Sequence, residues 1–307
     1  MPGVWTIARK EFRDHVSDRT FLLCFAALLI TMVGGALYFV QWINDFDWGW
    51  KYWYVYLIEY VTRNLSSIGV LVAIALSFNS INKERTEGSL KVLLSYPIYR
   101  DKIILGKILA GFLVITIVTI ASMTISFSIV VYYLSIPLTA DFLLRVVAMI
   151  AMGIVLLTFF LCVGTAVSTI LQDTSTIVLS LLLISALLQY QNYKVIVATA
   201  LYVLSFLGYN FIEPGFFTRS YFRMWYDDPF YLLYSKLSPV ESYLKLSERL
   251  FYYGKPFERF SGVYSGSIFT TFQEQLYGNL DLVAIPILYT VAAFIASYIL
   301  FTRREIA

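Results

Sequence analysis

Apolar residues gather in long runs along the chain, and six of these runs are long enough to cross a membrane. A bilayer core about 30 Å thick is crossed by about 20 apolar residues in helical form, because a helix satisfies its own backbone polar groups. The runs predict spans at residues 20–44, 64–82, 102–134, 142–171, 174–193 and 282–302. The expected fold class is therefore an all-α polytopic membrane protein with six transmembrane helices, in one domain over residues 1–307.

Apolar residues continue beyond the fifth predicted span, but one helix over residues 174–212 would be about 57 Å long with a lysine in its middle. We therefore expect a break near Gln189–Lys194. The following stretch either crosses a seventh time, dips into the membrane and returns, or lies along the outer surface. A seventh span would send Arg303 and Arg304 outside, against the positive-inside rule. We expect six spans, both termini in the cytoplasm, and a re-entrant or interfacial element at about residues 195–211.

The segment before the last span is rich in aromatic residues, and residues 195–281 are predicted to form a helical re-entrant and extracytoplasmic region. Within it, Ser238-Pro239-Val240-Glu241 combines a capping box with proline at the first helical position. Apolar residues then recur on one helical face, at Val240, Tyr243, Leu244, Leu250 and Phe251. We expect this face to pack on the ends of the spans rather than to contact a substrate, because an apolar stripe usually faces a core.

Two pairs of opposite charges stand four residues apart beside predicted spans, the spacing at which side chains meet on a helix. They are Glu59 with Arg63 and Asp141 with Arg145. Both are interpreted as ion pairs at the level of the lipid headgroups, where solvent leaves such pairs little energy.

The composition supports a membrane protein and excludes several other classes. Hydrophobic residues make up 59% of the chain and charged residues only 14%, against about 25% charged in soluble domains. The net charge is +3, without a basic tail for nucleic acid. Cys24 and Cys162 fall in apolar runs, so a disulfide framework is not expected. A single histidine, His15, excludes most histidine-based metal sites.

The segment between the second and third spans, residues 83–100, has the pattern of a short amphipathic helix. Its apolar ridge has the spacing i, i+3, i+4 and i+7, at Leu90, Leu93, Leu94 and Pro97. Such a helix fits a groove on a soluble partner, and burial of its three leucines would contribute about 5–9 kcal/mol before association entropy is subtracted. From the spacing alone, a helix that rests on lipid is an equally good interpretation.

Residues 1–18 predict an interfacial elbow helix ahead of the first span. Val4, Trp5, Ala8 and Phe12 have helical apolar spacing, and basic residues lie on the opposite face. The pattern alone leaves a plain membrane anchor and a role in coupling equally open.

Three parts of the sequence resemble type-2 ABC exporter permeases. The stretch Glu84-Arg85-x-x-Gly88-Ser89-Leu90-x-x-Leu93-Leu94-Ser95-x-Pro97-Ile98-x-Arg100, followed by Ile103-Ile104-Leu105-Gly106-Lys107, is similar to the signature of that family, with Ser89 where threonine is commoner. The start, Ala8-Arg9-Lys10-Glu11-Phe12-Arg13-Asp14, resembles the family's elbow helix. The close, Phe301-Thr302-Arg303-Arg304-Glu305, resembles its cytoplasmic end. The resemblance does not extend to residues 215–278.

The resemblance implies that residues 83–100 are a cytoplasmic coupling helix, seated in a groove of a separate ATP-binding subunit. The residues implied at this contact are Glu84, Arg85, Glu87, Gly88, Leu90, Leu93, Leu94, Pro97 and Arg100, and those of the elbow helix are Trp5, Arg9, Lys10 and Phe12. ATP and Mg²⁺ would bind to the partner, so this chain would hold no cofactor or metal and would not be catalytic. The resemblance also implies a second permease, identical or homologous, in the cytoplasmic membrane, and transport outward. It does not identify the substrate.

Two other functional classes share parts of this pattern. A membrane-embedded enzyme acting on lipid or glycan is disfavoured, because the sequence has no His-x-x-Glu and no Gly-x-Ser-x-Gly pattern. A noncatalytic assembly or anchoring subunit would have the same topology without any need for nucleotide hydrolysis. Co-purification with an ATPase, followed by ATP-dependent transport, separates these classes.

Overall fold

A computed structural model describes residues 3–44, 61–86, 100–134, 138–171, 174–188, 237–251 and 271–303. All regular secondary structure in these residues is helical, as the sequence predicts. The elements are α1 (Val4–Ser17), α2 (Arg19–Asn44), the π-helix η2 (Leu65–Gly69), α4 (Val70–Thr86), α6 (Arg100–Leu134), α7 (Ala140–Ile170), α8 (Thr174–Leu188), α12 (Pro239–Phe251), α13 (Phe272–Tyr277) and α14 (Leu280–Arg303).

Four helical segments are long and apolar enough to cross a membrane: Val61–Phe78, Asp101–Tyr133, Ala140–Ile170 and Leu280–Arg303. A fifth arises if α1 and the first part of α2, which meet at a bend of 66°, are counted as one broken span. The described part of the fifth predicted span, α8, has 15 residues and is about 22 Å long. The described residues therefore hold four or five candidate spans, and the count of six remains a prediction.

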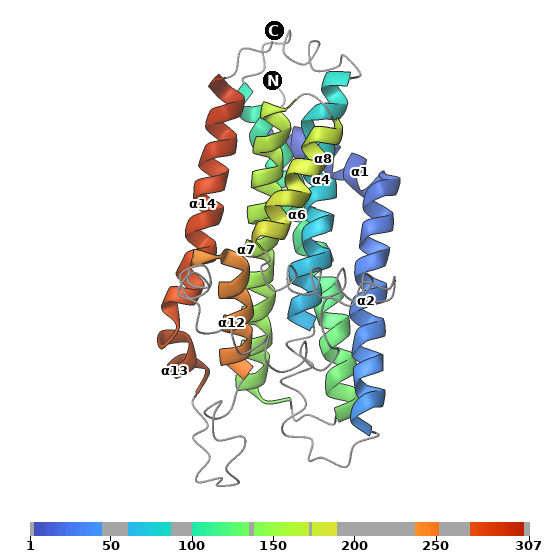
Figure 1. Ribbon diagram of the computed structural model, residues 1–307, viewed down its shortest axis with the longest axis vertical. Helices are drawn as coiled ribbons and strands as arrows, with labels where there is room; N and C mark the ends of the chain where they lie inside the picture. The colour runs from blue at the N-terminus through green and yellow to red at the C-terminus, as the bar shows by residue number, and fades with distance from the viewer. Residues whose placement is uncertain are drawn as a thin grey trace, which may run out of the picture.

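The long helices run side by side along one axis (Figure 1). At one end, called the elbow end, α1 lies across the start of α6. Ile7 of α1 packs there on an apolar cluster that includes Ile103 of α6 and Phe301 of α14. At the opposite end, called the far end, the start of α7 meets the end of α12 and the start of α13. Arg145 and Asp141 of α7 make these far-end contacts through hydrogen bonds to Leu250 and Phe272.

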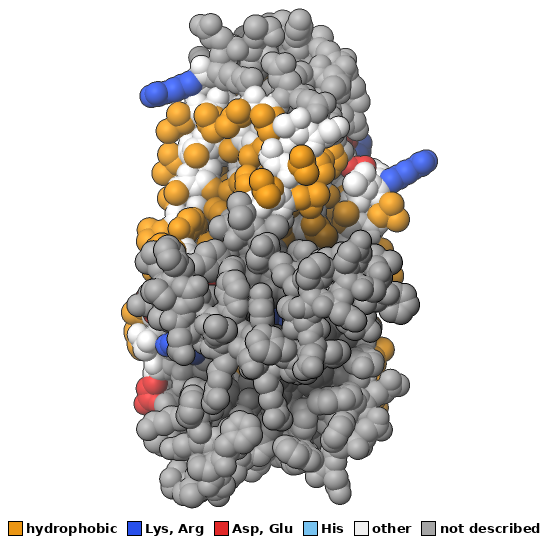
Figure 2. Space-filling view, viewed as in Figure 1, with side chains coloured by type: hydrophobic (Ala, Val, Ile, Leu, Met, Phe, Trp, Pro, Cys, Tyr) orange, Lys and Arg blue, Asp and Glu red, His pale blue; other side chains and the backbone are white. Residues whose placement is uncertain are grey.

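Helix α7 lies at the centre of the bundle, in contact with α4, α6, α12 and α14. Its side chains Leu156, Leu157 and Phe160 are almost fully buried. The outer helices leave large apolar side chains exposed, among them Leu23, Ile30, Ile117, Leu179 and Leu288. On the face in Figure 2, hydrophobic side chains form a band below the elbow end, with basic side chains at its border. Such a surface is typical of a protein whose surroundings are lipid.

Helix α12 confirms one expectation and corrects another. It begins at Pro239, and the backbone N–H of Glu241 donates to the Ser238 hydroxyl at 3.3 Å, as in the predicted cap. The sequence predicted that its apolar face would pack on the ends of the spans. Instead α12 is inserted beside α7 and α14, and its polar residues Ser242 and Ser247 are also buried. The apolar stripe therefore predicts the helix. It does not predict how deeply the helix is inserted in the bundle, because this depends on contacts with other helices.

Candidate functional site

The elbow helix α1 is held against the first turns of α6, directly after the segment that the sequence predicts to be a coupling helix. Ala8 on the inner face of α1 is fully buried, and Ile7 joins the apolar cluster of Ile103, Ile104 and Phe301. A helix that lay only on lipid would keep this face free. The contacts with α6 instead attach α1 to the bundle.

Gly106 allows α1 to approach α6 closely. A Cβ at Gly106 would lie 2.7 Å from Ile7 Cγ2 and 3.3 Å from the Val4 carbonyl oxygen. These distances are too short for any larger residue without displacement of α1. The glycine of the Ile103–Lys107 signature therefore has a structural reason: it is the crossing point of the two helices.

The next residue of α6, Lys107, forms a buried ion pair with α1. Its Nζ lies 3.0 Å from Glu11 Oε2, and the two side chains are 2% and 9% exposed. Because the low-dielectric surroundings strengthen the attraction and also penalise an unpaired charge, removing one partner of such a pair costs about 3–5 kcal/mol. The pair fixes α1 to α6 across 96 positions of sequence.

His15 lies on the same side of α1, one turn beyond Glu11, and is also buried. Burial lowers the pKa of the imidazole from its ordinary value of 6.5, and Lys107 lowers it further, while Glu11, Asp18 and Asp14 oppose the change. The docked helix therefore favours neutral His15.

The four elbow residues named from the sequence contribute unequally to this contact. Trp5 is 64% exposed, and Arg9 and Lys10 are also exposed, whereas Phe12 is half-buried against the core. Residues 4–17 are helical as predicted, and the interfacial position of this helix stays a prediction. Ala8, Glu11, Gly106 and Lys107 hold the helix against α6. In the sequence, Glu11, Gly106 and Lys107 stand out only as parts of the family resemblance. A helical wheel centred on Ala8 would have shown that Glu11 shares its face.

The residues named for contact with an ATP-binding subunit lie at or between the ends of two helices. Glu84 and Arg85 belong to the last turn of α4, and Arg100 is the first residue of α6. The others, namely Glu87, Gly88, Leu90, Leu93, Leu94 and Pro97, lie outside the described residues. Late α4 lies beside late α7, where the Ser168 hydroxyl donates to the Phe78 carbonyl at 3.3 Å.

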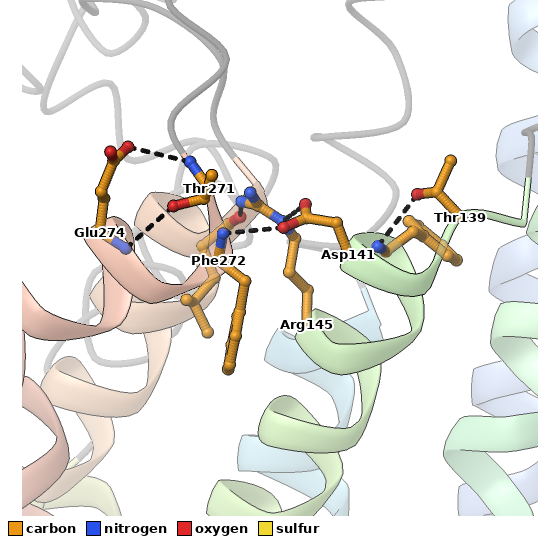
Figure 3. Close-up of polar contacts among 8 residues, drawn as sticks. Thr139, Asp141, Arg145, Thr271, Phe272 and Glu274 are labelled. Carbon is orange, nitrogen blue, oxygen red and sulfur yellow. Dashed lines mark hydrogen bonds and ion pairs between the residues drawn. The ribbon is translucent and has the colours of Figure 1, made fainter.

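At the far end, Asp141 and Arg145 form a clamp rather than a solvated ion pair (Figure 3). Arg145 is 1% exposed, and its Nε lies 2.6 Å from Asp141 Oδ2. A second guanidinium nitrogen donates to the Leu250 carbonyl in the last turn of α12, where carbonyls lack helical partners. Asp141 Oδ1 accepts from the Phe272 N–H at 2.8 Å. The expectation of a solvated pair of little energy is corrected, because Arg145 is buried and bound to the end of α12.

Two further caps fix the ends of the helices that meet at the clamp (Figure 3). The Thr139 hydroxyl accepts from the Phe142 N–H at 3.2 Å at the start of α7. Thr271 and Glu274 form a reciprocal capping box at the start of α13. The far end is thus a set of helix termini, in which Arg145 binds the end of α12 and Asp141 binds the start of α13.

Comparison with known proteins decides the family. The family described as "ABC-2 family transporter protein" matches residues 5–306. The chain belongs to this ABC-2 family. The match includes both the elbow helix and α14, so it covers the regions that the sequence resemblance left out.

Two curated proteins are similar over part of their length. The "Probable ABC transporter permease protein NosY" of Pseudomonas aeruginosa is 30% identical over 124 residues, which are 39% of this chain and 42% of that protein. The protein of the same description from Stutzerimonas stutzeri is 30% identical over 121 residues, 38% of this chain and 41% of that protein. The chain thus spans about two fifths of the length of the curated relatives it matches. As a member of the ABC-2 family, the chain is a multi-pass membrane protein.

The buried pair predicts that Glu11→Ala loosens the elbow helix of this ABC-2 permease. With the Lys107 ammonium buried beside no carboxylate from α1, undocking becomes easier by about 3 kcal/mol, or about a hundredfold. Trypsin reports this change at Arg9, Lys10 and Arg13, because a helix is cleaved when it opens. Asp14→Ala is the matched control, since Asp14 is exposed and forms its ion pair with Lys10, which is also exposed, at 4.0 Å. Equal cleavage of Glu11→Ala and the unmodified chain would contradict the role of the pair.

The buried imidazole predicts that the docking of α1 depends on pH. Because the pKa of His15 is lowered in the docked helix, His15 binds a proton more tightly when α1 is undocked. Docking therefore has its full stability at a pH above 6.5, the ordinary pKa of histidine. It weakens as the pH falls through that value toward the lower pKa of docked His15. Hydrogen exchange of the α1 amides, corrected for intrinsic rates, measures this weakening between about pH 7.5 and about pH 5.5. His15→Gln should abolish the pH dependence, and an unchanged dependence in that variant would refute it.

Proposed function

We propose that this ABC-2 permease is the membrane-spanning subunit of an ATP-driven exporter and that residues 83–100 couple it to a separate ATP-binding subunit. ATP and Mg²⁺ then bind to that partner, and this chain converts the partner's motion into rearrangement of its helices. The observation that carries the proposal is the buried Glu11–Lys107 pair, which attaches the elbow helix to α6 next to the coupling segment.

The arrangement of α4, α6 and α1 supports the transmission of force from this segment. Residues 83–100 join the end of α4 to the start of α6, so a displacement of the segment acts on both helices. Lys107 follows Arg100 by seven residues, about 10 Å along the helix. The same displacement therefore reaches α1 through Gly106 and Lys107. Because the contact between α1 and α6 lies so close to the start of α6, little of the displacement is lost along α6 before it reaches α1.

We propose six spans with both termini in the cytoplasm. The exposed basic residues Arg9, Lys10, Arg13 and Arg303 lie at the elbow end, on α1 and at the end of α14. Short segments rich in Lys and Arg lie on the cytoplasmic side of membrane proteins. The elbow end then faces the cytoplasm, and the far end, with the Arg145 clamp, faces outward.

The functional assembly is proposed to contain two permease chains and two ATP-binding subunits. A bundle with four or five candidate spans in its described part is small for a pathway that it would line alone. The exposed apolar faces of α8 and α14 provide surfaces for a second permease and for lipid.

The coupling assignment predicts that Leu93→Asp separates this chain from an ATP-binding subunit encoded beside it. Loss of one buried leucine removes about 1.5–3 kcal/mol, which is about tenfold or more in affinity, and a desolvated carboxylate weakens binding further. The readout is the amount of ATP-binding subunit that co-purifies from detergent-solubilised membranes.

Leu138→Asp is the matched control for this prediction. It introduces the same charge at a leucine that is 65% exposed and belongs to the far end, so co-purification should be unchanged. Undiminished binding by Leu93→Asp would refute the coupling assignment. Binding without any ATP hydrolysis by the complex would instead support an anchoring subunit.

A further inference from the structure

Tyr243 of α12 reaches the point where several elements meet in the interior of the bundle. The ring is fully buried, and its hydroxyl lies 3.4 Å from the place that a Cβ on Gly153 of α7 would occupy. Thr119 Cγ2 of α6 lies 3.4 Å from the same place, and Leu65 Cδ2 of η2 lies 2.7 Å from it. The absence of a side chain at Gly153 therefore allows α6, α7, α12 and η2 to converge there.

The hydroxyls of Thr119 and Tyr243 have no hydrogen-bond partner in the described structure, although both are fully buried. Other hydroxyls of the same helices do have partners. Thr116 donates to the Phe112 carbonyl at 2.8 Å, and Ser122 donates to the Val118 carbonyl at 2.8 Å. A buried polar group that lacks a partner destabilises the state in which it is seen. The Tyr243 hydroxyl and the Thr119 methyl group both lie beside Gly153, so the two unpaired hydroxyls belong to neighbouring side chains.

The C-terminal half of α12 is held to its neighbours at the far end. Ser247 and Thr62 share a hydrogen bond of 3.2 Å between their hydroxyl oxygens, and Arg145 binds the Leu250 carbonyl. Arg249 donates to Asn279, just before α14. These contacts hold the C-terminal half of α12 in place. Opposite Tyr243, Leu65 belongs to a π-helix, a rare element that is frequent at functional sites.

We propose that Thr119 and Tyr243 form a hydrogen-bonding subsite for the transported molecule, which α12 uncovers when Tyr243 moves away from Gly153. The inference rests on the proposed function and deepens it by naming a class of substrate. Each hydroxyl both donates and accepts one or more hydrogen bonds, and the adjoining Leu65 is apolar. Glu241 lies two positions before Tyr243, about 200° around the helix. The subsite therefore suits a neutral molecule with a hydroxyl or carbonyl group on an apolar body.

The first test measures the melting temperature of the purified chain. Tyr243→Phe and Thr119→Val keep the shape of each side chain and remove its unpaired hydroxyl. Each should raise the melting temperature by about 2–4 °C. Ser247→Ala is the control and should lower it, because that hydroxyl is bonded to Thr62. A fall in melting temperature for both Tyr243→Phe and Thr119→Val would show that the hydroxyls have structural partners, and would overturn the inference.

The second test asks whether water reaches the subsite during transport. Thr119→Cys is introduced into a chain with Cys24→Ser and Cys162→Ala, assembled with the ATP-binding subunit, and exposed to a hydrophilic methanethiosulfonate. We expect labelling at least about tenfold faster during ATP hydrolysis than without ATP. Leu28→Cys, also fully buried but on α2, should stay unlabelled. Decanol, which carries one hydroxyl on an apolar chain, should slow the labelling, whereas decane should not, and Tyr243→Phe should remove this difference.

The outcomes separate this inference from the proposed function. Two results overturn the subsite and leave the permease function standing. In the first, the complex hydrolyses ATP but Thr119→Cys stays unlabelled. In the second, decane slows the labelling as much as decanol does. Absence of any ATP-hydrolysing complex overturns the proposed function, and the subsite with it.

Discussion

The buried contact between α1 and α6 is the constraint on which the rest of the account depends. Glu11 and Lys107 are charged side chains removed from solvent, so each is stable there mainly because the other is present. Gly106 lets the two helices approach closely enough for this pair to form. The elbow helix thereby becomes part of the bundle, and a force applied at the start of α6 acts on both helices together.

The far end has a different construction, because it joins helix termini rather than helix faces. Arg145 is buried under α12 and binds a carbonyl at its end, while Asp141 holds both the guanidinium and the first N–H of α13. The same α7 that carries this clamp also carries Gly153, where Tyr243 reaches the interior. The central helix α7 therefore connects the C-terminal end of α12 to the place where the Tyr243 hydroxyl has no partner.

Much of the fold follows from local patterns, because apolar runs and caps are features of short stretches of sequence. The elbow helix, α12 and its cap at Ser238, and the long spans were predicted in this way. The pairing of Glu11 with Lys107 was not, because it joins residues on different helices and no spacing along the chain reports it. Arg145 illustrates the same limit: its spacing from Asp141 was visible, but its burial depends on α12, more than 100 residues later.

The most direct test of the account measures the distance between α1 and α6 during the ATP cycle. Nitroxide labels at Trp5 and Ile117, both exposed, allow this distance to be measured by pulsed electron resonance in the complex with its ATP-binding subunit. If the buried pair makes the two helices one body, the distance distribution is the same without nucleotide and with ATP trapped in the partner. A displacement of α1 relative to α6 on ATP binding would contradict the central claim.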